Sequence, residues 1–420
     1  MTEVAGVSVD GPAGRALWAR ADRVLPGGGI YLTRSADLAG RGVLPGFVAA
    51  AEGCRVEDVD GRGYVDWLCA NGPNLLGYRH PEIEAAVTAE QARTGTASLF
   101  PPALVELLER LVDRFPPMAW GVLGRNGSEV VSLGARVARQ HTGRGRLLAF
   151  ERAYHGNDPE LASAPRPGVL ADGTARVDRL PWNDPQALAD HGRRHGSDIA
   201  AILVNPLDQG PLVPTTAATP EFVAALHEFR SRFGVLLLLD SVRHGFRLHP
   251  DGCHRALGLE PDLLVLGKAL GNGHAISALL AVDDLRKAAR KILFTSTYMF
   301  ESPPMRGAAK VLEIYDRDAV FERIRATGER LCSGLRAAAE DAGADIVLSG
   351  PPTMPSLFFA DDDDRTKGRA FCRALAERGV IWHPLLNHFV SAAHDDAAVA
   401  TTLAAAREAF ATLRSSEVRS

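Results

Sequence analysis

The sequence predicts an α/β protein whose large domain is a mostly parallel sheet covered by helices, with a smaller α+β domain from both chain ends. Short aliphatic runs alternate with helical patterns from about residue 73 to 303, which is typical of such a sheet. The 420 residues, 46% of them hydrophobic, supply a large core. The C-terminal part is instead rich in long, alanine-heavy helical patterns. We therefore expect domain segments at 1–72, 73–305 and 306–420, the middle one forming the large domain.

The predicted strands differ between the two domains. Near the N-terminus, residues 52–59 and 64–68 flank the pair Asp60-Gly61, which favours an antiparallel hairpin. In the large domain, short aliphatic runs predict buried strands. These runs lie at 120–123, 147–150, 199–204, 235–239 and 263–266.

Two helices of the large domain have clear boundaries. One is expected from Ser128 to about His141. The other begins at Thr219-Pro220, where a capping residue precedes a proline, and ends at Gly234. Its apolar residues repeat at helical spacing, so one helical layer over the sheet is predicted.

The composition excludes several classes of function. The 47 basic and 51 acidic side chains give a formal net charge of −4 without a basic block at either end, so nucleic acid is not an expected partner. The longest run of Val, Ile and Leu alone, 235–239, is far shorter than the roughly 20 residues of a membrane helix. Because the N-terminus also lacks a basic and then apolar leader, we expect a cytoplasmic protein without a membrane contact. Five scattered cysteines without CxxC spacing predict reduced core thiols and no metal site.

Lys268 is the first lysine of the chain, and it stands at an unusual place for one. It follows the aliphatic run 263–266 and Gly267 and precedes the glycine-rich segment 269–273. An ammonium group that loses hydration there has a lowered pKa, and the neutral amine can hold a carbonyl cofactor as a Schiff base. The alternative is a lysine that reaches water from the end of a strand. A phosphate-binding nucleotide loop fits poorly, because Ala269 stands where Ser or Thr is needed.

Asp240 follows the predicted strand 235–239. Ligands of open α/β sheets bind beyond the carboxyl ends of the strands, so Asp240 and Lys268 are expected at one site. Pyridoxal 5'-phosphate (PLP) requires such a pair, an imine-forming lysine and an acid beside the pyridine nitrogen. Alternatively, Asp240 caps the following turn.

The segment 125–129, with Gly127 and Ser128, offers a seat for the phosphate. It lies between the predicted strand 120–123 and a helix, whose first amide groups and dipole favour an anion. Tyr154, followed by His155, leaves another predicted strand and is placed to lie against a pyridine ring. An ordinary helix start and a core tyrosine are the alternatives.

In this combination the segments resemble the class III (subgroup II) PLP-dependent aminotransferases, with the closest similarity to the glutamate-1-semialdehyde 2,1-aminomutase branch. The resemblance extends from about residue 15 to 412. The segments that carry it are Leu25-Pro26-Gly27-Gly28 with Arg34, residues 56–66, 126–129, Tyr154-His155-Gly156, Asp240 with Gly245-Phe246-Arg247, and 261–273.

The resemblance implies a fold type I homodimer with a shared active site. It implies that Lys268 is the imine lysine and proton shuttle and that Asp240 binds the pyridine nitrogen. Thr297 would reach the cofactor phosphate of the neighbouring subunit, and Arg34 would bind a substrate carboxylate. The remaining cofactor contacts implied are Gly127, Ser128, Tyr154 and His155, and the candidate substrate contacts besides Arg34 are Tyr31, Trp67 and Asn71.

The expected activity is therefore transfer of an amino group between an amino acid or amine and a carbonyl substrate. An aminomutase, another carbanion outcome such as decarboxylation or epimerisation, and an inactive PLP-fold binding protein are the alternatives. The sequence departs from the family at Ser241 and Asn205, where the family usually has glutamate. Two negative charges are thus missing near the expected cofactor. Their loss changes the local potential and hydrogen bonding, so the amino donor and the reaction outcome are expected to depend on it.

Overall fold

The computed structural model describes residues 8–26, 41–162, 168–170, 173, 176–210 and 213–417. The chain divides into a small unit, residues 1–80, 211–214 and 322–420, and a large unit, residues 81–210 and 215–321. The large unit thus ends later than the predicted boundary at 305. The reason is helix α10 (Pro303–Arg317), which packs on α3 (Pro81–Arg93) and is tied to it by an ion pair between Arg317 and Glu82.

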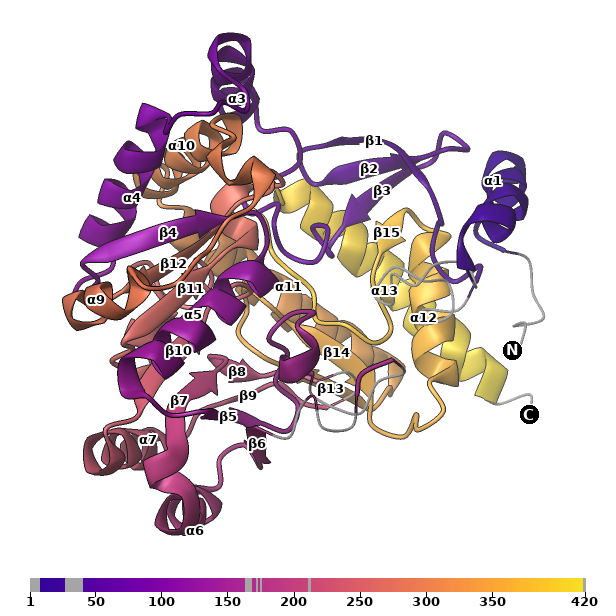
Figure 1. Ribbon diagram of the computed structural model, residues 1–420. Coiled ribbons are helices and arrows are strands. Elements are labelled where there is room, and N and C mark those ends of the chain that lie inside the picture. The colour runs from indigo at the N-terminus through magenta and orange to yellow at the C-terminus, as the bar shows by residue number, and fades with distance from the viewer. Residues whose placement is uncertain are drawn as a thin grey trace. The chain divides into compact units, whose positions relative to one another are not determined.

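The large unit is built on a seven-stranded sheet (Figure 1). Its strands are β4 (Trp120–Gly124), β5 (Arg146–Phe150), β6 (Val177–Leu180), β7 (Ile199–Val204), β10 (Leu236–Asp240), β11 (Leu263–Leu266) and β12 (Ser277–Ala281). The order is β4-β12-β11-β10-β7-β5-β6, and β12 runs in the direction opposite to that of the other six strands. The prediction of a mostly parallel sheet is confirmed, and every predicted strand is present. A short hairpin, β8 (Leu207–Asp208) with β9 (Thr216–Ala217), also belongs to this unit.

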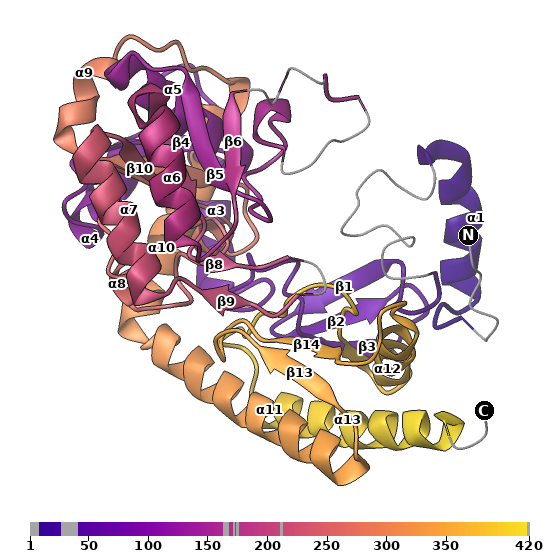
Figure 2. The same cartoon turned by 90° about the horizontal axis from the view of Figure 1, so that it is seen from below.

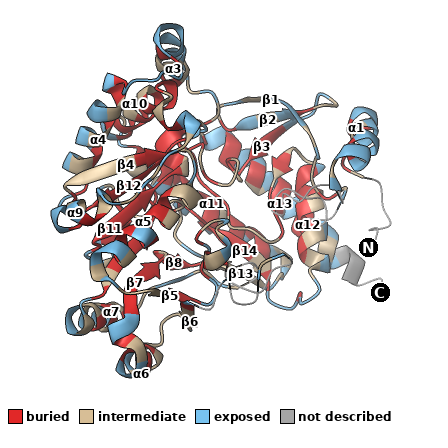
Figure 3. Ribbon diagram, viewed as in Figure 1, coloured by how far each residue is buried: buried red, intermediate tan, exposed pale blue. Residues whose placement is uncertain are grey.

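Helices cover the sheet, and its strands form the buried core (Figure 3). Besides α3 and α10, the helices are α4 (Pro102–Arg114), α5 (Gly127–Thr142), α6 (Pro185–His195), α7 (Pro220–Phe233), α8 (Cys253–Leu257) and α9 (Arg286–Ala289). Helices α6 and α7 lie side by side (Figure 2). Helix α7 has its predicted boundaries: the Thr219 side chain accepts the Phe222 N–H at 3.2 Å, and Gly234 ends the helix with a φ of +61°.

The small unit combines both ends of the chain in one sheet. Its order is β1 (Val48–Glu52), β2 (Arg55–Asp58), β3 (Gly63–Asp66) and β15 (Val380–Ile381), with β15 parallel to β3. The predicted hairpin around Gly61 is present as β2 and β3, which pair antiparallel. The remaining elements are the hairpin β13 (Ile346–Ser349) and β14 (Ser356–Phe359), and helices α1 (Pro12–Val24), α11 (Val320–Ala342, which begins in the large unit), α12 (Thr366–Ala376) and α13 (Asp396–Glu417).

Two further expectations concern the core and the membrane. All five cysteines are buried and none forms a disulfide bond, as expected for reduced core thiols. Within the described ranges, every helix is too short or too polar to cross a membrane.

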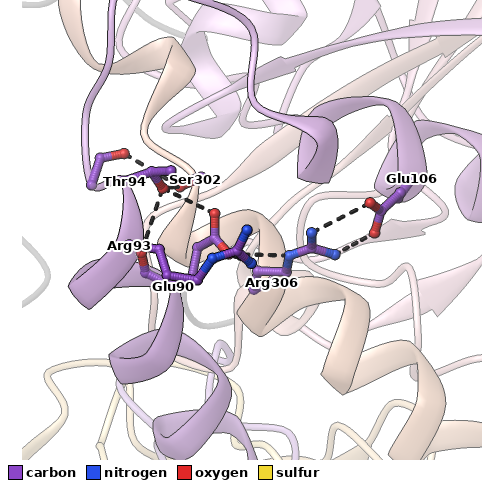
Figure 4. A network of polar contacts seen from close by, with 7 residues as sticks. Glu90, Arg93, Thr94, Glu106, Ser302 and Arg306 are labelled. Carbon is purple, nitrogen blue, oxygen red and sulfur yellow. Dashed lines mark hydrogen bonds and ion pairs between the residues drawn. The ribbon is translucent and has the colours of Figure 1, made fainter.

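A buried carboxylate joins α3 to the start of α10 (Figure 4). Glu90 is only 5% exposed, and it accepts a hydrogen bond from Thr94 at 2.9 Å and from Arg306 at 3.4 Å. Arg306 also pairs with Glu106 on the surface. Burial by itself would raise the pKa of Glu90, but hydrogen bonds from Ser302, Thr94 and Arg306 outweigh it and hold the pKa below its ordinary value.

Replacing Glu90 by glutamine is expected to lower the free energy of unfolding by about 1–3 kcal/mol at pH 7, since charged hydrogen bonds are lost. The depressed pKa of Glu90 means that its contribution is present at neutral pH and is lost as the pH falls below 4.5, the ordinary glutamate value. Urea unfolding at several pH values should therefore show a smaller acid dependence in Glu90→Gln than in the native protein. Glu106→Gln, which removes an exposed partner of Arg306, is the control and should change little. Equal losses in both variants would contradict the role of burial.

Candidate active site

A cavity of about 730 Å³ lies in the large unit, within the size range of small-molecule sites. It is lined by residues that follow the carboxyl ends of β4, β5, β7, β10 and β11, where ligands of open α/β sheets bind. The cavity brings together six of the predicted site residues. These are Gly127, Ser128, Tyr154, His155, Asp240 and Lys268.

Lys268 is placed by the end of β11. Gly267 follows this strand, and Lys268 opens a short 3₁₀ turn, η5 (Lys268–Gly271), with a φ of +46°. This left-handed backbone is uncommon for a residue with a side chain and is typical of functional sites. Burial, assisted by the positive charge of Arg243 and opposed by Asp240, lowers the pKa of Lys268 to about 7. Near neutral pH, much more of this amine is therefore neutral and nucleophilic than in an ordinary lysine.

Asp240 is the last residue of β10 and is 4% exposed. One of its carboxylate oxygens lies 2.9 Å from Nδ1 of His155, and the other accepts the Val242 N–H at 3.2 Å. His155 is almost fully buried, and among the described residues its Nε2 atom has no hydrogen-bond partner. The carboxylate is thus held in a fixed orientation, and a buried polar atom beside it is left for a ligand.

The N-terminus of α5 forms the predicted anion seat. The Asn126 side chain caps the helix by accepting the Glu129 N–H at 3.1 Å, and the Glu129 carboxylate accepts the Arg125 N–H at 2.8 Å. The Ser128 hydroxyl oxygen accepts the Asn157 N–H at 3.0 Å, which leaves its own hydrogen to donate. Because amide groups and the helix dipole favour negative charge here, a phosphate group fits.

Gly156 packs directly against this seat. Its φ of +102° is a left-handed conformation, and a Cβ atom there would lie 2.4 Å from the Ser128 Oγ and 2.8 Å from the Ser128 Cα. Only glycine satisfies both conditions. The segment after β5 is therefore pressed against Ser128 and fixes the position of its hydroxyl group.

Gly156→Ala is expected to raise the dissociation constant for PLP at least about tenfold, because Ser128 must move to make room. Gly143→Ala is the matched control, since Gly143 also has a positive φ, +71°, but has open space around it. Both variants should lose about 1–2 kcal/mol of stability from backbone strain, whereas only the first should bind cofactor more weakly. Fluorescence titration of the cofactor-free proteins measures this difference. Equal affinities would rule out the close packing.

Tyr154 presents an aromatic surface to the cavity. Its side chain is 46% exposed, and its hydroxyl group donates to Asn157 at 3.2 Å. An exposed ring in a cavity is available to stack on a flat ligand. The exposed tyrosine, the unpartnered His155 nitrogen and the helix N-terminus together fit the ring and the phosphate of PLP.

Three of the remaining predicted residues are described but do not line this cavity. Trp67 is fully buried in the small unit, donates to Thr402 at 2.8 Å and stacks on His394. This corrects the expectation that it contacts substrate, because an aromatic ring enclosed in a core cannot line a pocket. Asn71 lies in the small unit with a φ of +68°. Thr297 is exposed and is the first residue of the turn η7 (Thr297–Phe300). The substrate contact of Asn71 and the cofactor contact of Thr297 stay predictions.

The substrate-binding predictions for Tyr31 and Arg34 fall outside the described residues. The two departures from the family pattern have different surroundings. Ser241 points to a buried thiol, with 2.7 Å between its Oγ and the Sγ of Cys253. Asn205 lines the cavity and donates to the main-chain oxygen of Asp240 at 3.4 Å.

Several polar residues of the cavity were not predicted from the sequence. Arg152 pairs with the buried Asp208, and His244 lies 2.9 Å from the side-chain oxygen of Gln209. Arg243 also lines the cavity. Their common signal in the sequence is a position just after a predicted strand, the same signal that predicted Asp240, Lys268 and Tyr154.

Comparison with known proteins places this site in a family. A model of the class-III aminotransferases matches residues 39–394. The aminopentol aminotransferase of Sphingopyxis macrogoltabida is 38% identical over 395 residues, or 93% of this chain and 92% of that protein. A glutamate-1-semialdehyde 2,1-aminomutase of Methanothermobacter thermautotrophicus is 31% identical over 95% of this chain and 99% of its own. The FumI protein of Sphingopyxis sp. MTA144, solved in its PLP internal aldimine form, matches with a TM-score of 0.93 at 37% identity, covering 97% of this chain and 98% of that chain.

These similarities confirm the predicted family, fold type I and the PLP cofactor. The relatives include an aminotransferase as well as aminomutases, so both of the leading activities predicted from the sequence are represented among them. The chain belongs to the class III aminotransferases, PLP-dependent enzymes of fold type I.

Proposed function

We propose that this protein transfers an amino group between an amine or amino acid and a carbonyl substrate, with PLP held by Lys268. The observation that supports the proposal is the content of one cavity. An amine with a pKa of about 7 and a fixed carboxylate, Asp240, line it together with a helix N-terminus and an exposed tyrosine ring.

In this proposal each side chain has one task toward the cofactor. Asp240, oriented by His155, keeps the pyridine nitrogen protonated. The amide groups at Gly127 and the hydroxyl group of Ser128 bind the phosphate, and Tyr154 covers the ring. When bound, PLP supplies an electron-accepting ring that stabilises negative charge on the substrate carbon.

Lys268 also moves the proton. With cofactor and substrate bound, the free amine of Lys268 would take a proton from the substrate carbon and return it at a neighbouring position. A pKa of about 7 suits both halves of this task, because the group gives and takes protons near neutral pH.

The proposed substrates follow from the relatives and from one predicted residue. The relative named as an aminopentol aminotransferase makes an amino-alcohol the first donor class to test. The predicted carboxylate contact of Arg34 makes a keto acid the first acceptor class. An aminomutase is the second candidate because relatives at 31–32% identity carry that name.

We also propose a cytoplasmic homodimer whose subunits share the active site. Leu99, Phe100 and Tyr298 are 80%, 70% and 60% exposed, although large apolar side chains are normally covered. Phe100 packs edge-on against Phe300, so these residues belong to one region, next to Thr297. A second copy that covers this region would bring Thr297 toward its neighbour's cofactor.

The test begins with the covalent linkage. After incubation with PLP and reduction with sodium borohydride, peptide mass mapping should find the cofactor on the peptide that contains Lys268. Amino donors are then screened by the loss of the visible band of the bound cofactor. Formation of an isomer without any keto acid would favour the aminomutase, and labelling at another lysine would refute the assignment.

A further inference from the structure

Arg125 stands directly before the phosphate seat but does not line the cavity. Its side chain is only 12% exposed, and its guanidinium group donates to three main-chain oxygens. Nη1 donates to Ala275 at 3.0 Å, Nη2 donates to Glu301 at 2.9 Å, and Nε donates to Tyr298. Because all three nitrogen atoms are engaged, the orientation of this side chain is fixed.

The oxygens that Arg125 binds belong to two other segments of the large unit. Ala275 lies between the turn η5, which begins with Lys268, and strand β12. Tyr298 lies in the turn η7, and Glu301 directly follows that turn. The start of α5 is thus joined to the segment that carries Lys268.

The main chain at Arg125 is also fixed. Its N–H donates to one oxygen of the Glu129 carboxylate at 2.8 Å, and the other oxygen accepts from the Asn126 side chain at 3.0 Å. The main-chain oxygen of Asn126 accepts the Ser277 hydroxyl at 2.9 Å, which is a second link to the start of β12. The phosphate seat and the segment after Lys268 therefore share one hydrogen-bonded network.

The positive charge of Arg125 is balanced within this network. Glu301 forms an ion pair with it, with 3.5 Å between Oε2 and Nη1, and Glu129 also attracts the guanidinium group. A cation whose charge is matched by nearby carboxylates attracts a further anion less strongly. We therefore expect Arg125 to act on cofactor binding through position and not through charge.

The PLP cofactor has to be held at two points. Its phosphate group belongs in the seat at the start of α5 and its aldehyde at Lys268, and the two groups lie at a fixed separation in one small molecule. When the aldehyde is captured, its carbon forms a double bond to the lysine nitrogen and its oxygen leaves as water. A ligand bound at one end reacts fast at the other only if the two protein groups match its length.

We propose that Arg125 is a positioning residue, which holds the phosphate seat at the distance from the Lys268 amine that PLP requires. This inference rests on the proposed function. By joining the start of α5 to the segment after Lys268, the guanidinium group lets both ends of PLP bind at once. Without it each end still has its own site, but the bound phosphate no longer brings the aldehyde to the lysine.

Three ligands separate the two ends of the cofactor. PLP carries both groups, pyridoxine 5'-phosphate lacks the aldehyde, and pyridoxal lacks the phosphate. In the cofactor-free protein, the rate constants for covalent capture of PLP and of pyridoxal are measured by trapping with sodium borohydride and mapping the peptide that contains Lys268. The dissociation constant for pyridoxine 5'-phosphate is measured by fluorescence titration.

Arg125→Met is expected to lower the rate constant for capture of PLP at least about tenfold, because the phosphate no longer places the aldehyde at Lys268. The capture of pyridoxal and the dissociation constant for pyridoxine 5'-phosphate should stay within about threefold of the native values. Arg125→Lys keeps the charge but lacks the guanidinium fork that reaches three oxygens, so its loss should be intermediate.

Arg144→Met is the matched control. Arg144 also donates to two main-chain oxygens, those of Ile199 at 3.0 Å and Gly234 at 3.4 Å. These oxygens lie at the amino ends of β7 and β10, whereas the cavity lies at the carboxyl ends of the strands. This variant loses bonds of the same kind and should leave all three quantities unchanged.

A loss that is confined to PLP in Arg125→Met and absent from Arg144→Met supports the inference. The inference is overturned if PLP capture stays native in Arg125→Met, or if pyridoxal capture or the affinity for pyridoxine 5'-phosphate falls as strongly as PLP capture. Should Arg125→Met not fold, Arg125→Lys decides by the same comparison of the three ligands. Failure of the native protein to label at Lys268 would instead refute the proposed function itself.

Discussion

Lys268→Ala lowers the rate of amino transfer by at least about 10³-fold, because the variant loses both the covalent attachment of the cofactor and the group that moves the proton. Phosphate binding at the start of α5 does not involve this side chain, so PLP should still bind, without becoming attached by borohydride. Steady-state rates and peptide mass mapping measure the two losses separately. Lys291→Ala, at an exposed lysine of the same unit, is the control and should behave as the native protein.

The pKa of Lys268 gives this prediction a second readout. In the cofactor-free protein, only the neutral amine attacks PLP, and its fraction rises with pH through the pKa of about 7. The rate of covalent capture should therefore rise between about pH 6 and 8 and level off above, whereas an ordinary lysine would still gain at pH 10. A rate that keeps rising to pH 10 would contradict the buried environment of Lys268, and near-native turnover in Lys268→Ala would contradict its role.

The fold could be predicted from the sequence where one physical signal dominated. Buried parallel strands such as β7 and β11 are continuous aliphatic runs, and α7 carries a capping threonine and a terminal glycine. Strand β10 was expected to end at Leu239 but includes Asp240, whose backbone pairs with Val265. A prediction based on hydrophobicity ends the strand at a charged residue, even where the backbone of that residue still pairs.

Other parts depend on contacts that the sequence does not display. Strand β12 follows a glycine-rich segment and reverses the direction of the chain within the sheet, and a local aliphatic pattern does not report direction. Trp67 directly follows a segment that resembles the family, yet its ring fills the core against His394, far along the chain. In the sequence nothing distinguishes Arg243 from an ordinary turn residue, whereas in the structure it lines the cavity together with Lys268.

Asp240→Asn is expected to lower turnover at least about 10²-fold, since the amide cannot keep the pyridine nitrogen protonated and a fixed charge at the reacting group is lost. Asp262→Asn is the matched control. Asp262 is also buried and directly precedes β11 of the same sheet, where it pairs with Arg230 and accepts the Leu237 N–H, and it does not line the cavity. Asp262→Asn should lower stability in thermal unfolding and leave turnover per folded protein unchanged. If turnover fell in proportion to the loss of stability in both variants, the proposed role of Asp240 toward the cofactor would be contradicted.

Asp240 and Arg243 also make opposite predictions for the same nitrogen, which separates electrostatics from general damage. Asp240 raises the pKa of Lys268 and Arg243 lowers it. In the cofactor-free protein, the pH midpoint of covalent capture should therefore fall below about 7 in Asp240→Asn and rise above it in Arg243→Met. Loosened packing would move both midpoints upward, toward that of a hydrated lysine. If the two midpoints shift in opposite directions, both charges act directly on Lys268. If they shift in the same direction, this direct action is contradicted.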